Sequence, residues 1–300
     1  MDDYVGLALA AYVIWGVSNF LDRVVVSTRG VSAGAYVILG AWCAPALLAF
    51  LPWVEMARPS LRELGLALTA GAVFLVVLWP YYTALETEEA SRVVPLWHLE
   101  PIFILIATKL LWDEGLPGAA KLAFPMLLVG SAVLSVDDLR DFTRIRPRAL
   151  WMLPAVAAAA AHALLTRALV RTYDPFAAAL LIRWCCAGLT VLLMFVPAVR
   201  RRALAQALDT DFPSIALTGV TLLLGSIGFF LYNRALKLGP AAIATAMSGI
   251  TAVVVLALAI AAKRVAPGWV EERVDRESLV QKAIGIALMA GGVVVLSLWH

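Results

Sequence analysis

Residues 241–262 read AAIATAMSGITAVVVLALAIAA, a run of apolar and small side chains without a charged residue. A helix needs about 20 mostly apolar residues to cross the hydrocarbon core of a bilayer. Lipid offers no hydrogen-bond partners, so the amides of such a run must bond within the run itself, as they do in an α-helix. The stretch therefore predicts a membrane-spanning helix.

The same pattern recurs along the 300-residue chain. Hydrophobic residues make up 62% of the sequence and charged residues 15%, and the mean hydropathy is +0.88. A soluble domain is about half apolar and about a quarter charged, which excludes an ordinary soluble enzyme and a disordered protein. The net charge of +3 is too small to indicate nucleic acid as a partner. We expect an all-α integral membrane protein with ten spans, at residues 4–28, 33–54, 64–85, 93–112, 118–136, 149–172, 175–199, 213–236, 241–262 and 280–299.

Charged residues collect between these spans and divide the chain. A polar linker at residues 137–148 separates a first five-helix unit, residues 1–136, from a second, residues 149–300. Another loop opens at residues 200–202, and the longest polar stretch covers residues 263–278. The loops are too short for a folded soluble domain, so any chemistry is expected inside the membrane.

The beginning of the chain and its cysteines fit this interpretation. The acidic start, Met1-Asp2-Asp3, and the long apolar run after it are unlike a cleaved secretory signal, so the first helix is expected to stay. Cys43, Cys185 and Cys186 lie inside apolar segments, which favours buried packing over disulfides.

Lysines and arginines are unevenly distributed between the two sides. The loops after the odd-numbered spans carry nearly twice as many as the side that holds both termini. The positive-inside rule then predicts that the odd loops are cytoplasmic and that the termini are outside.

The two units share residues in the same order, which indicates an internal repeat. The matching pairs are Trp42-Cys43 with Trp184-Cys185, Tyr81 with Tyr232, Ala84-Leu85 with Ala235-Leu236, Lys121 with Lys282, and Gly130 with Gly291. Five spans is an odd number, so the second unit would lie upside down relative to the first. Inverted repeats are typical of secondary transporters, whose substrate site lies near the midplane between the repeats.

Several short motifs carry a resemblance to a known module. They are Trp15-Gly16 with Asn19-Phe20, Ala84-Leu85 through Ala90, Leu99-Glu100-Pro101-Ile102-Phe103, Trp112-Asp113-Glu114-Gly115-Leu116, and Arg183-Trp184. Together they resemble the EamA module of the drug/metabolite transporter (DMT) superfamily, in two copies over nearly the whole chain. The resemblance implies a ten-helix DMT fold of two inverted five-helix repeats. It also implies cytoplasmic termini, opposite to the charge count.

The chain departs from that module at three places. Ala41 stands where the first unit would carry an arginine, and Ala252 aligns with Pro101. In the second unit, Lys263-Arg264-Val265 replaces the ending that contains glutamate.

Three predicted spans present aromatic and polar side chains on one face. The stripes are Trp15, Asn19 and Asp22 in the first span, Trp79, Tyr82 and Glu86 in the third, and Val93, Trp97, Glu100 and Ile104 in the fourth. Such stripes suit a cavity for an amphipathic organic solute, because rings supply contact area and Asn and Tyr supply hydrogen bonds. The alternative is that the aromatic side chains only pack.

Glu100 lies about eight residues into its predicted span. A lone carboxylate at that depth is costly unless it is paired, protonated or hydrated. We predict that Glu100 couples a proton to transport, with Asp22 as a second candidate. The alternative is a neutral acid that bonds a neighbouring helix across the kink at Pro101.

The repeat extends the predicted cavity to the second unit. His162 corresponds to Trp15, Thr166 to Asn19, and Tyr232 and Asn233 to Tyr81 and Tyr82. His98 is included as a further cavity residue beside Trp97. Arg183 lies in mid-span, where it either binds a substrate carboxylate or supports the structure. No Cys/His spacing forms a metal site, so no metal is predicted.

The sequence contains no HExxH, GxSxG, P-loop or GxGxxG motif, so no enzyme activity and no cofactor are expected. We predict a secondary transporter that moves a small organic metabolite, such as an amino acid or a related amphipathic compound, by alternating access. Export by proton antiport or facilitated diffusion is expected, by a monomer in the inner membrane of a bacterial or archaeal cell. The alternative class is an intramembrane enzyme or lipid-handling protein that acts on a bilayer substrate.

Overall fold

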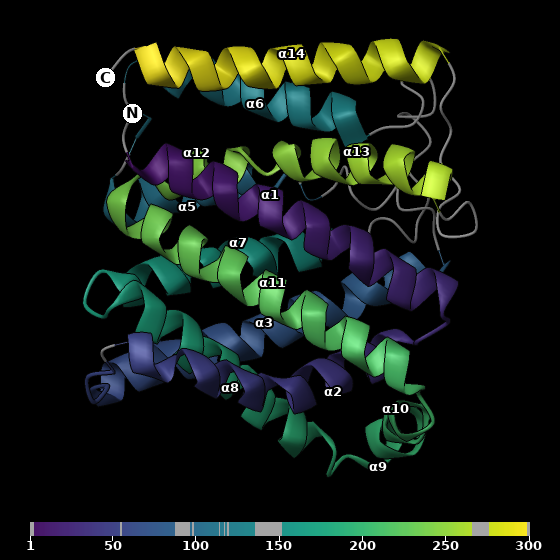
Figure 1. Cartoon of the computed structure of the whole chain (residues 1–300). Coiled ribbons are helices and arrows are strands. Elements are labelled where there is room, and N and C mark those ends of the chain that lie inside the picture. The colour runs from purple at the N-terminus through teal and green to yellow at the C-terminus, as the bar shows by residue number, and fades with distance from the viewer. Residues whose placement is uncertain are drawn as a thin grey trace.

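Helices make up every regular element in the described part of the chain (Figure 1). The structure, a computed structural model, describes residues 3–54, 56–87, 97, 99–113, 115, 116, 118, 120–135, 152–265 and 276–298. The predicted polar linker at residues 137–148 and His98 lie outside the described residues.

The first half begins with a long α-helix that continues into a short π-helix. The elements are α1 (Asp3–Arg23), the π-helix η1 (Val24–Thr28), α2 (Ala33–Cys43), the 3₁₀-helix η2 (Ala44–Trp53), α3 (Leu61–Thr87), α5 (Glu100–Trp112) and α6 (Ala120–Ser135). Ser32 caps α2, because its hydroxyl accepts a hydrogen bond from the Ala35 amide at 3.4 Å. A proline at the start of η2, Pro45, lacks the amide that an α-helix would use.

The described residues of the second half are also helical, with three short helical segments between α8 and α11. Its elements are α7 (Met152–Val170), α8 (Pro175–Leu193), α9 (Pro197–Val199), the π-helix η4 (Arg200–Leu204), α10 (Ala205–Leu208), α11 (Phe212–Leu238), α12 (Ala241–Ala246), α13 (Gly249–Val265) and α14 (Arg276–Leu298). Asp174 caps α8 by accepting from the amides of Phe176 and Ala177 at 2.9 and 3.0 Å.

Two expectations about this half are corrected. Residues 200–202 were expected to open a loop, yet they begin the helical segment η4–α10, whose Ala-, Leu- and Gln-containing sequence favours helix. The predicted span at residues 241–262 is interrupted by a turn at Met247-Ser248, between α12 and α13.

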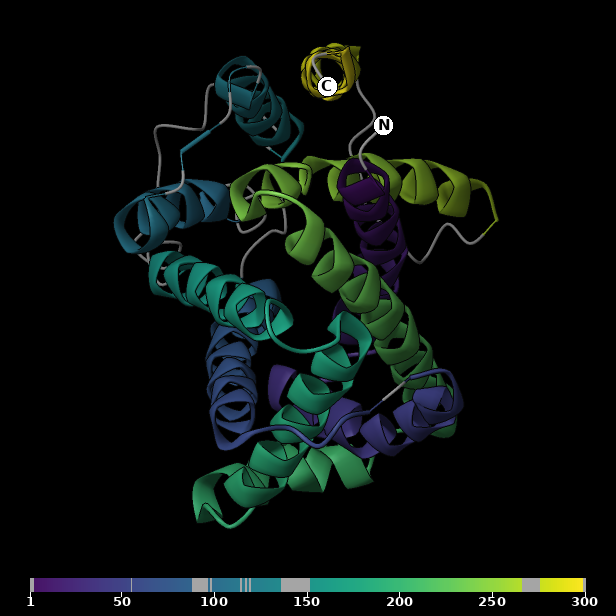
Figure 2. The same ribbon diagram turned by 90° about the vertical axis from the view of Figure 1, so that its left-hand side faces the viewer.

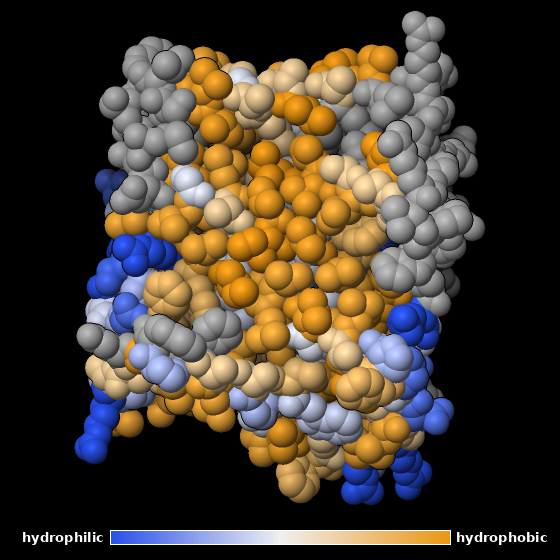
Figure 3. All heavy atoms as spheres, in the orientation of Figure 1, coloured by the Kyte–Doolittle hydropathy of each residue, from blue (hydrophilic) through white to orange (hydrophobic). Residues whose placement is uncertain are grey.

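Each predicted span coincides with at least one helix, and the chain is an all-α, multi-pass integral membrane protein. In the part of the chain that the structure describes, five helical segments are both long and apolar enough to cross a bilayer: Tyr4–Val26, Leu61–Leu78, Pro175–Leu193, Phe212–Leu238 and Ala241–Ala262, the last of which contains the turn at Met247-Ser248. Shorter apolar helices cover Ala33–Ala49, Ala120–Gly130, Pro154–Val170 and Ala283–Val295. In Figure 3 an apolar band separates hydrophilic side chains at the two ends of the helices.

Helices of the two halves pack against each other in the bundle. The most extensive contacts join α1 to α11, α6 to α14, and α3 to α7. Glycine permits the close approach of α6 to α14: a Cβ on Gly130 of α6 would lie 2.7 Å from Met289 Cγ and 2.8 Å from the Gly285 carbonyl oxygen of α14. Helix α1 begins and α14 ends on the same side of the bundle (Figure 1).

Candidate functional site

Glu100 is the first residue of α5, and it follows a turn at Leu99. This corrects the expectation that Trp97 and Glu100 share one continuous helix, because the turn separates them. The Glu100 side chain is half-buried and lies within electrostatic range of the phenol groups of Tyr12 and Tyr232.

Three aromatic rings from α1 and α11 pack together, and two of them belong to Tyr12 and Tyr232. The Trp15 and Tyr232 rings lie 5.3 Å apart between centroids, and Tyr12 packs against them at 5.2 and 6.0 Å. Trp15 Nε1 donates to the Gly225 carbonyl oxygen at 3.0 Å, and Tyr232 shares a 2.8 Å hydrogen bond with Thr245. The cluster is therefore fixed by hydrogen bonds as well as by packing.

Arg183 and His162 share a second pair of rings. The guanidinium carbon of Arg183 lies 4.9 Å from the ring centroid of Phe74 and 5.1 Å from that of Phe229. The His162 ring lies 5.1 Å from Phe74 and 5.7 Å from Phe229, and its Nδ1 is 3.0 Å from the Ala70 carbonyl oxygen. This contact makes Nδ1 the donor, as in a buried, hydrogen-bonded histidine. Among the described residues no group of three potential metal ligands occurs.

Asp22 belongs to a third, buried cluster between α1, α2 and α11. Tyr36 donates to its carboxylate, and the Tyr36 hydroxyl lies 2.7 Å from that of Thr221. Ser18 donates to the Thr221 carbonyl oxygen at 3.1 Å. Asp22 also lies within electrostatic range of Arg183, whereas Glu100 lies within that of Tyr12 and Tyr232.

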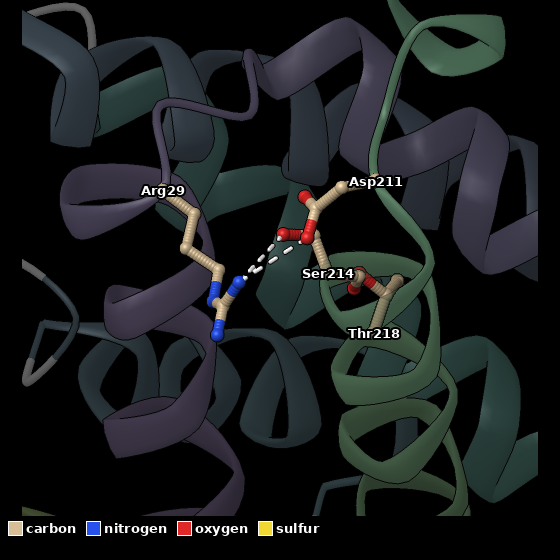
Figure 4. A network of polar contacts seen from close by, with 4 residues as sticks. All are labelled: Arg29, Asp211, Ser214 and Thr218. Atoms are coloured by element: carbon tan, nitrogen blue, oxygen red, sulfur yellow. Dashed lines mark hydrogen bonds and ion pairs between the residues drawn. The ribbon is translucent and has the colours of Figure 1, made fainter.

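A polar contact lies at the start of α11 (Figure 4). Arg29 Nη1 lies 3.3 Å from Asp211 Oδ2 and 3.4 Å from the Ser214 hydroxyl, and Thr218 donates to the Ser214 carbonyl oxygen at 2.8 Å. The Ser214 hydroxyl, and secondarily Arg29, lower the pKa of Asp211 below its ordinary value. The carboxylate consequently stays charged and paired at neutral pH.

The other predicted cavity residues are dispersed. Trp97 packs edge-on against Tyr81 at 5.3 Å, Asn19 is half-buried on α1, and Asn233 donates to the Pro175 carbonyl oxygen at 3.3 Å. Thr166 is fully buried, and its hydroxyl has no hydrogen-bond partner among the described atoms. The side chains of Trp79 and Tyr82 lie outside the described part of the structure, although their backbone belongs to α3.

Several site residues were not anticipated from the sequence: Tyr12, Ser18, Tyr36, Phe74 and Phe229. Tyr12 lies one helical turn before Trp15, so the stripe on the first span contained a signal for it. The other four are ordinary residues in apolar helices, and only the packing of α1, α2, α3 and α11 gives them their roles.

Known proteins resemble this chain in sequence and in fold. Residues 4–136 match the model of the EamA-like transporter family. A solved structure described only as "Crystal structure of protein" has 18% sequence identity, covers 98% of this chain and 96% of its own, and superimposes with a TM-score of 0.69. At that identity the likeness shows a shared fold alone. No curated protein matches the chain. The family match over residues 4–136 confirms the resemblance noted in the sequence of the first unit.

Proposed function

We propose that the protein is a ten-span secondary transporter, built from two inverted five-helix repeats, that moves a small organic metabolite by alternating access. The pairing of helices supports the repeat. If α1 corresponds to α7 and α3 to α11, the contact of α1 with α11 has its counterpart in that of α7 with α3. The contacts of α1 with α13 and of α2 with α11 likewise have counterparts in α7 with α5 and α8 with α3.

Hydrogen bonds inside the bundle follow the same relation. Trp15 of α1 donates to a carbonyl oxygen of α11, and His162 of α7 bonds a carbonyl oxygen of α3. Trp15 and His162 are the pair that the sequence repeat aligns. The corresponding rings of the two units thus make the same kind of contact with the third span of the opposite unit.

Contacts at the two ends of the bundle are also related. Arg29, which follows the first span, meets Asp211, which precedes the eighth. Tyr173, which follows the sixth span, donates to the Ala57 carbonyl oxygen, before the third span, at 2.5 Å. Exchanging the two units turns one contact into the other, as an inverted repeat requires.

The observation that carries a transport function is a pair of half-buried charged residues inside the bundle. Glu100 lies near aromatic rings of α1 and α11, and Arg183 lies against rings of α3 and α11. Charged groups are costly in a membrane interior and usually mark a substrate or ion pathway. Rings with one acidic and one basic group suit an amphipathic solute such as an amino acid. The match of residues 4–136 to a transporter family favours this function over the alternative of an intramembrane enzyme.

Reconstitution of the full chain in vesicles tests the proposal. A panel of labelled amino acids and related amphipathic compounds is supplied with and without a pH gradient, and flux is measured. At least one solute is expected to move faster with the gradient in the wild type. Glu100→Gln should remove the gradient dependence, whereas Asp209→Asn, at an exposed carboxylate, should retain it. Full coupling in Glu100→Gln would contradict the proton role. Turnover of a bilayer lipid without flux of any solute would favour the enzyme alternative.

A further inference from the structure

A groove lies on the outer side of α5, beside the start of α6. Its volume is about 460 Å³, and its apolar lining includes Leu105, Ile106, Leu110 and Leu116. Ile106 and Leu110 are 54% and 79% exposed. Figure 2 shows α5 and α6 at the edge of the bundle, away from the α1–α11 contact. The groove therefore opens toward the lipid side of the molecule and is separate from the charged residues of the interior.

Two lysines complete the lining of this apolar groove. Lys109, in the last turn of α5, and Lys121, in the first turn of α6, both belong to the lining and are exposed. Nearby, the guanidinium carbon of Arg171 lies 4.8 Å from the Trp112 ring centroid. Tryptophan and basic residues at helix ends are typical of the level of the lipid headgroups. The groove thus passes from apolar walls to positive charge where a headgroup would lie.

We propose that this groove is a binding site for one anionic phospholipid. An acyl chain would lie along Leu105, Ile106 and Leu110, and the phosphate would lie between the ammonium groups of Lys109 and Lys121. Charge complementarity favours an anionic phospholipid over a zwitterionic one, because each lysine near a membrane surface adds attraction for anionic lipid. The apolar walls favour a phospholipid over free phosphate. The proposal does not depend on the transported solute.

A neighbouring carboxylate provides a way to test the role of charge. Lys109 Nζ lies 2.5 Å from Asp113 Oδ1 on the next turn, and this lysine lowers the pKa of Asp113. Asp113 is therefore ionised at neutral pH and competes with the phosphate for Lys109. Removal of that carboxylate should strengthen phospholipid binding, whereas removal of either lysine should weaken it.

The experiment uses the purified full chain in detergent micelles. Dioleoyl phosphatidylglycerol or dioleoyl phosphatidylcholine is titrated in, and native mass spectrometry measures the fraction of protein that retains one lipid. The variants are Lys109→Gln with Lys121→Gln, Asp113→Asn, and the control Lys237→Gln, at an exposed lysine at the end of α11. Inorganic phosphate is titrated separately as a competitor.

We expect the wild type to retain phosphatidylglycerol in preference to phosphatidylcholine. The double lysine variant should bind it about thirtyfold more weakly, Asp113→Asn several-fold more tightly, and Lys237→Gln like the wild type. Equal retention of both lipids, or an unchanged double variant, would overturn the proposal in favour of a general lipid annulus. Displacement by phosphate alone, or formation of a dimer that excludes the lipid, would also overturn it. Thermal unfolding of each variant without lipid identifies any folding defect. Asp113→Asn is a further check, because it should raise the affinity for phosphatidylglycerol, which a folding defect would not do.

Discussion

At the scale of single residues, the planar guanidinium of Arg183 makes contacts that a lysine cannot reproduce. Its guanidinium lies against the Phe74 and Phe229 rings, where a flat, delocalised cation stacks better than an ammonium group does. Arg183→Lys keeps the charge but loses the planar contact. We therefore expect the flux of the transported solute to fall about tenfold, since cation–π contacts contribute about 0.5–2 kcal/mol and a tenfold change corresponds to about 1.4 kcal/mol. The matched control is Arg234→Lys, at an exposed position on α11, and equal flux in both variants would contradict the assignment.

Asp22 gives a stability prediction at the same scale. The carboxylate is buried and accepts a hydrogen bond from Tyr36, whose hydroxyl also contacts Thr221. Tyr36→Phe leaves a buried acceptor without this donor, which typically costs about 1–3 kcal/mol. The free energy of unfolding of Tyr36→Phe, measured in mixed micelles, should be lower than that of the wild type by this amount. In the background of Asp22→Asn the same substitution should cost less, because the charged acceptor is gone. Additive losses in the double variant would show that the two side chains do not interact.

The contact between Arg29 and Asp211 predicts a pH response. Hydrogen bonds from Ser214 and the charge of Arg29 lower the folded-state pKa of Asp211. A lowered pKa means that the ionised contact is complete above the ordinary aspartate value, about 3.9, and is lost only as the pH falls through the lowered value. In a background without Cys43, Cys185 and Cys186, the labelling rate of Thr210→Cys is divided by that of free glutathione at the same pH, which corrects for the fraction of thiolate. This relative rate should stay constant from neutral pH to about 4 and rise in stronger acid. The variant Asp211→Asn should label at the higher rate throughout, and a wild-type rise above pH 5 would contradict the prediction.

At the scale of helices, the pair α6 and α14 depends on glycine at the contact. A Cβ on Gly130 would meet the Gly285 carbonyl oxygen at 2.8 Å and the Met289 amide nitrogen at 3.0 Å. Backbone atoms cannot turn away as a side chain can, so Gly130→Ala should separate the helices and cost about 1–3 kcal/mol. Gly188→Ala is the control, because no atom lies within 4 Å of its added Cβ. A lower melting temperature is expected for the first variant only, and equal melting temperatures would contradict the close approach.

The sequence predicts helices better than it predicts their interruptions. Long apolar runs dictate helix in lipid whatever their neighbours, so each predicted span coincides with a helix. The turn at Met247-Ser248 left no mark in the hydropathy, because apolar and small residues surround it. The turn before Glu100 lies next to Pro101, where the sequence indicated a kink but not the end of a helix. Among the site residues, Trp15 and Tyr232 do meet. The ring partners of Arg183 come from helices far apart in sequence, and Tyr36, the partner of Asp22, lies on the next helix, so no pattern within one helix contains them.

At the scale of the whole molecule, the related contacts at the two ends bear on alternating access. The pair Arg29–Asp211 joins the units at one end, and the pair Ala57–Tyr173 joins them at the other. In alternating access one repeat rocks against the other around the substrate site. A pathway that opens at either end must then separate the contact at that end. Each contact is therefore expected to break once in every transport cycle.

This expectation can be tested by cross-linking the contact at each end of the bundle separately. In a background with Cys43, Cys185 and Cys186 replaced by alanine, cysteine pairs are placed at residues 29 and 211 or at residues 57 and 173 and joined by a short bismaleimide. Either cross-link should stop solute flux in vesicles almost completely, because one pathway can no longer open. The four single-cysteine variants, treated with the same reagent, are the controls and should keep their flux. Continued flux with one end tied would mean that this end does not open, and continued flux with either end tied would argue against rocking of the two repeats altogether.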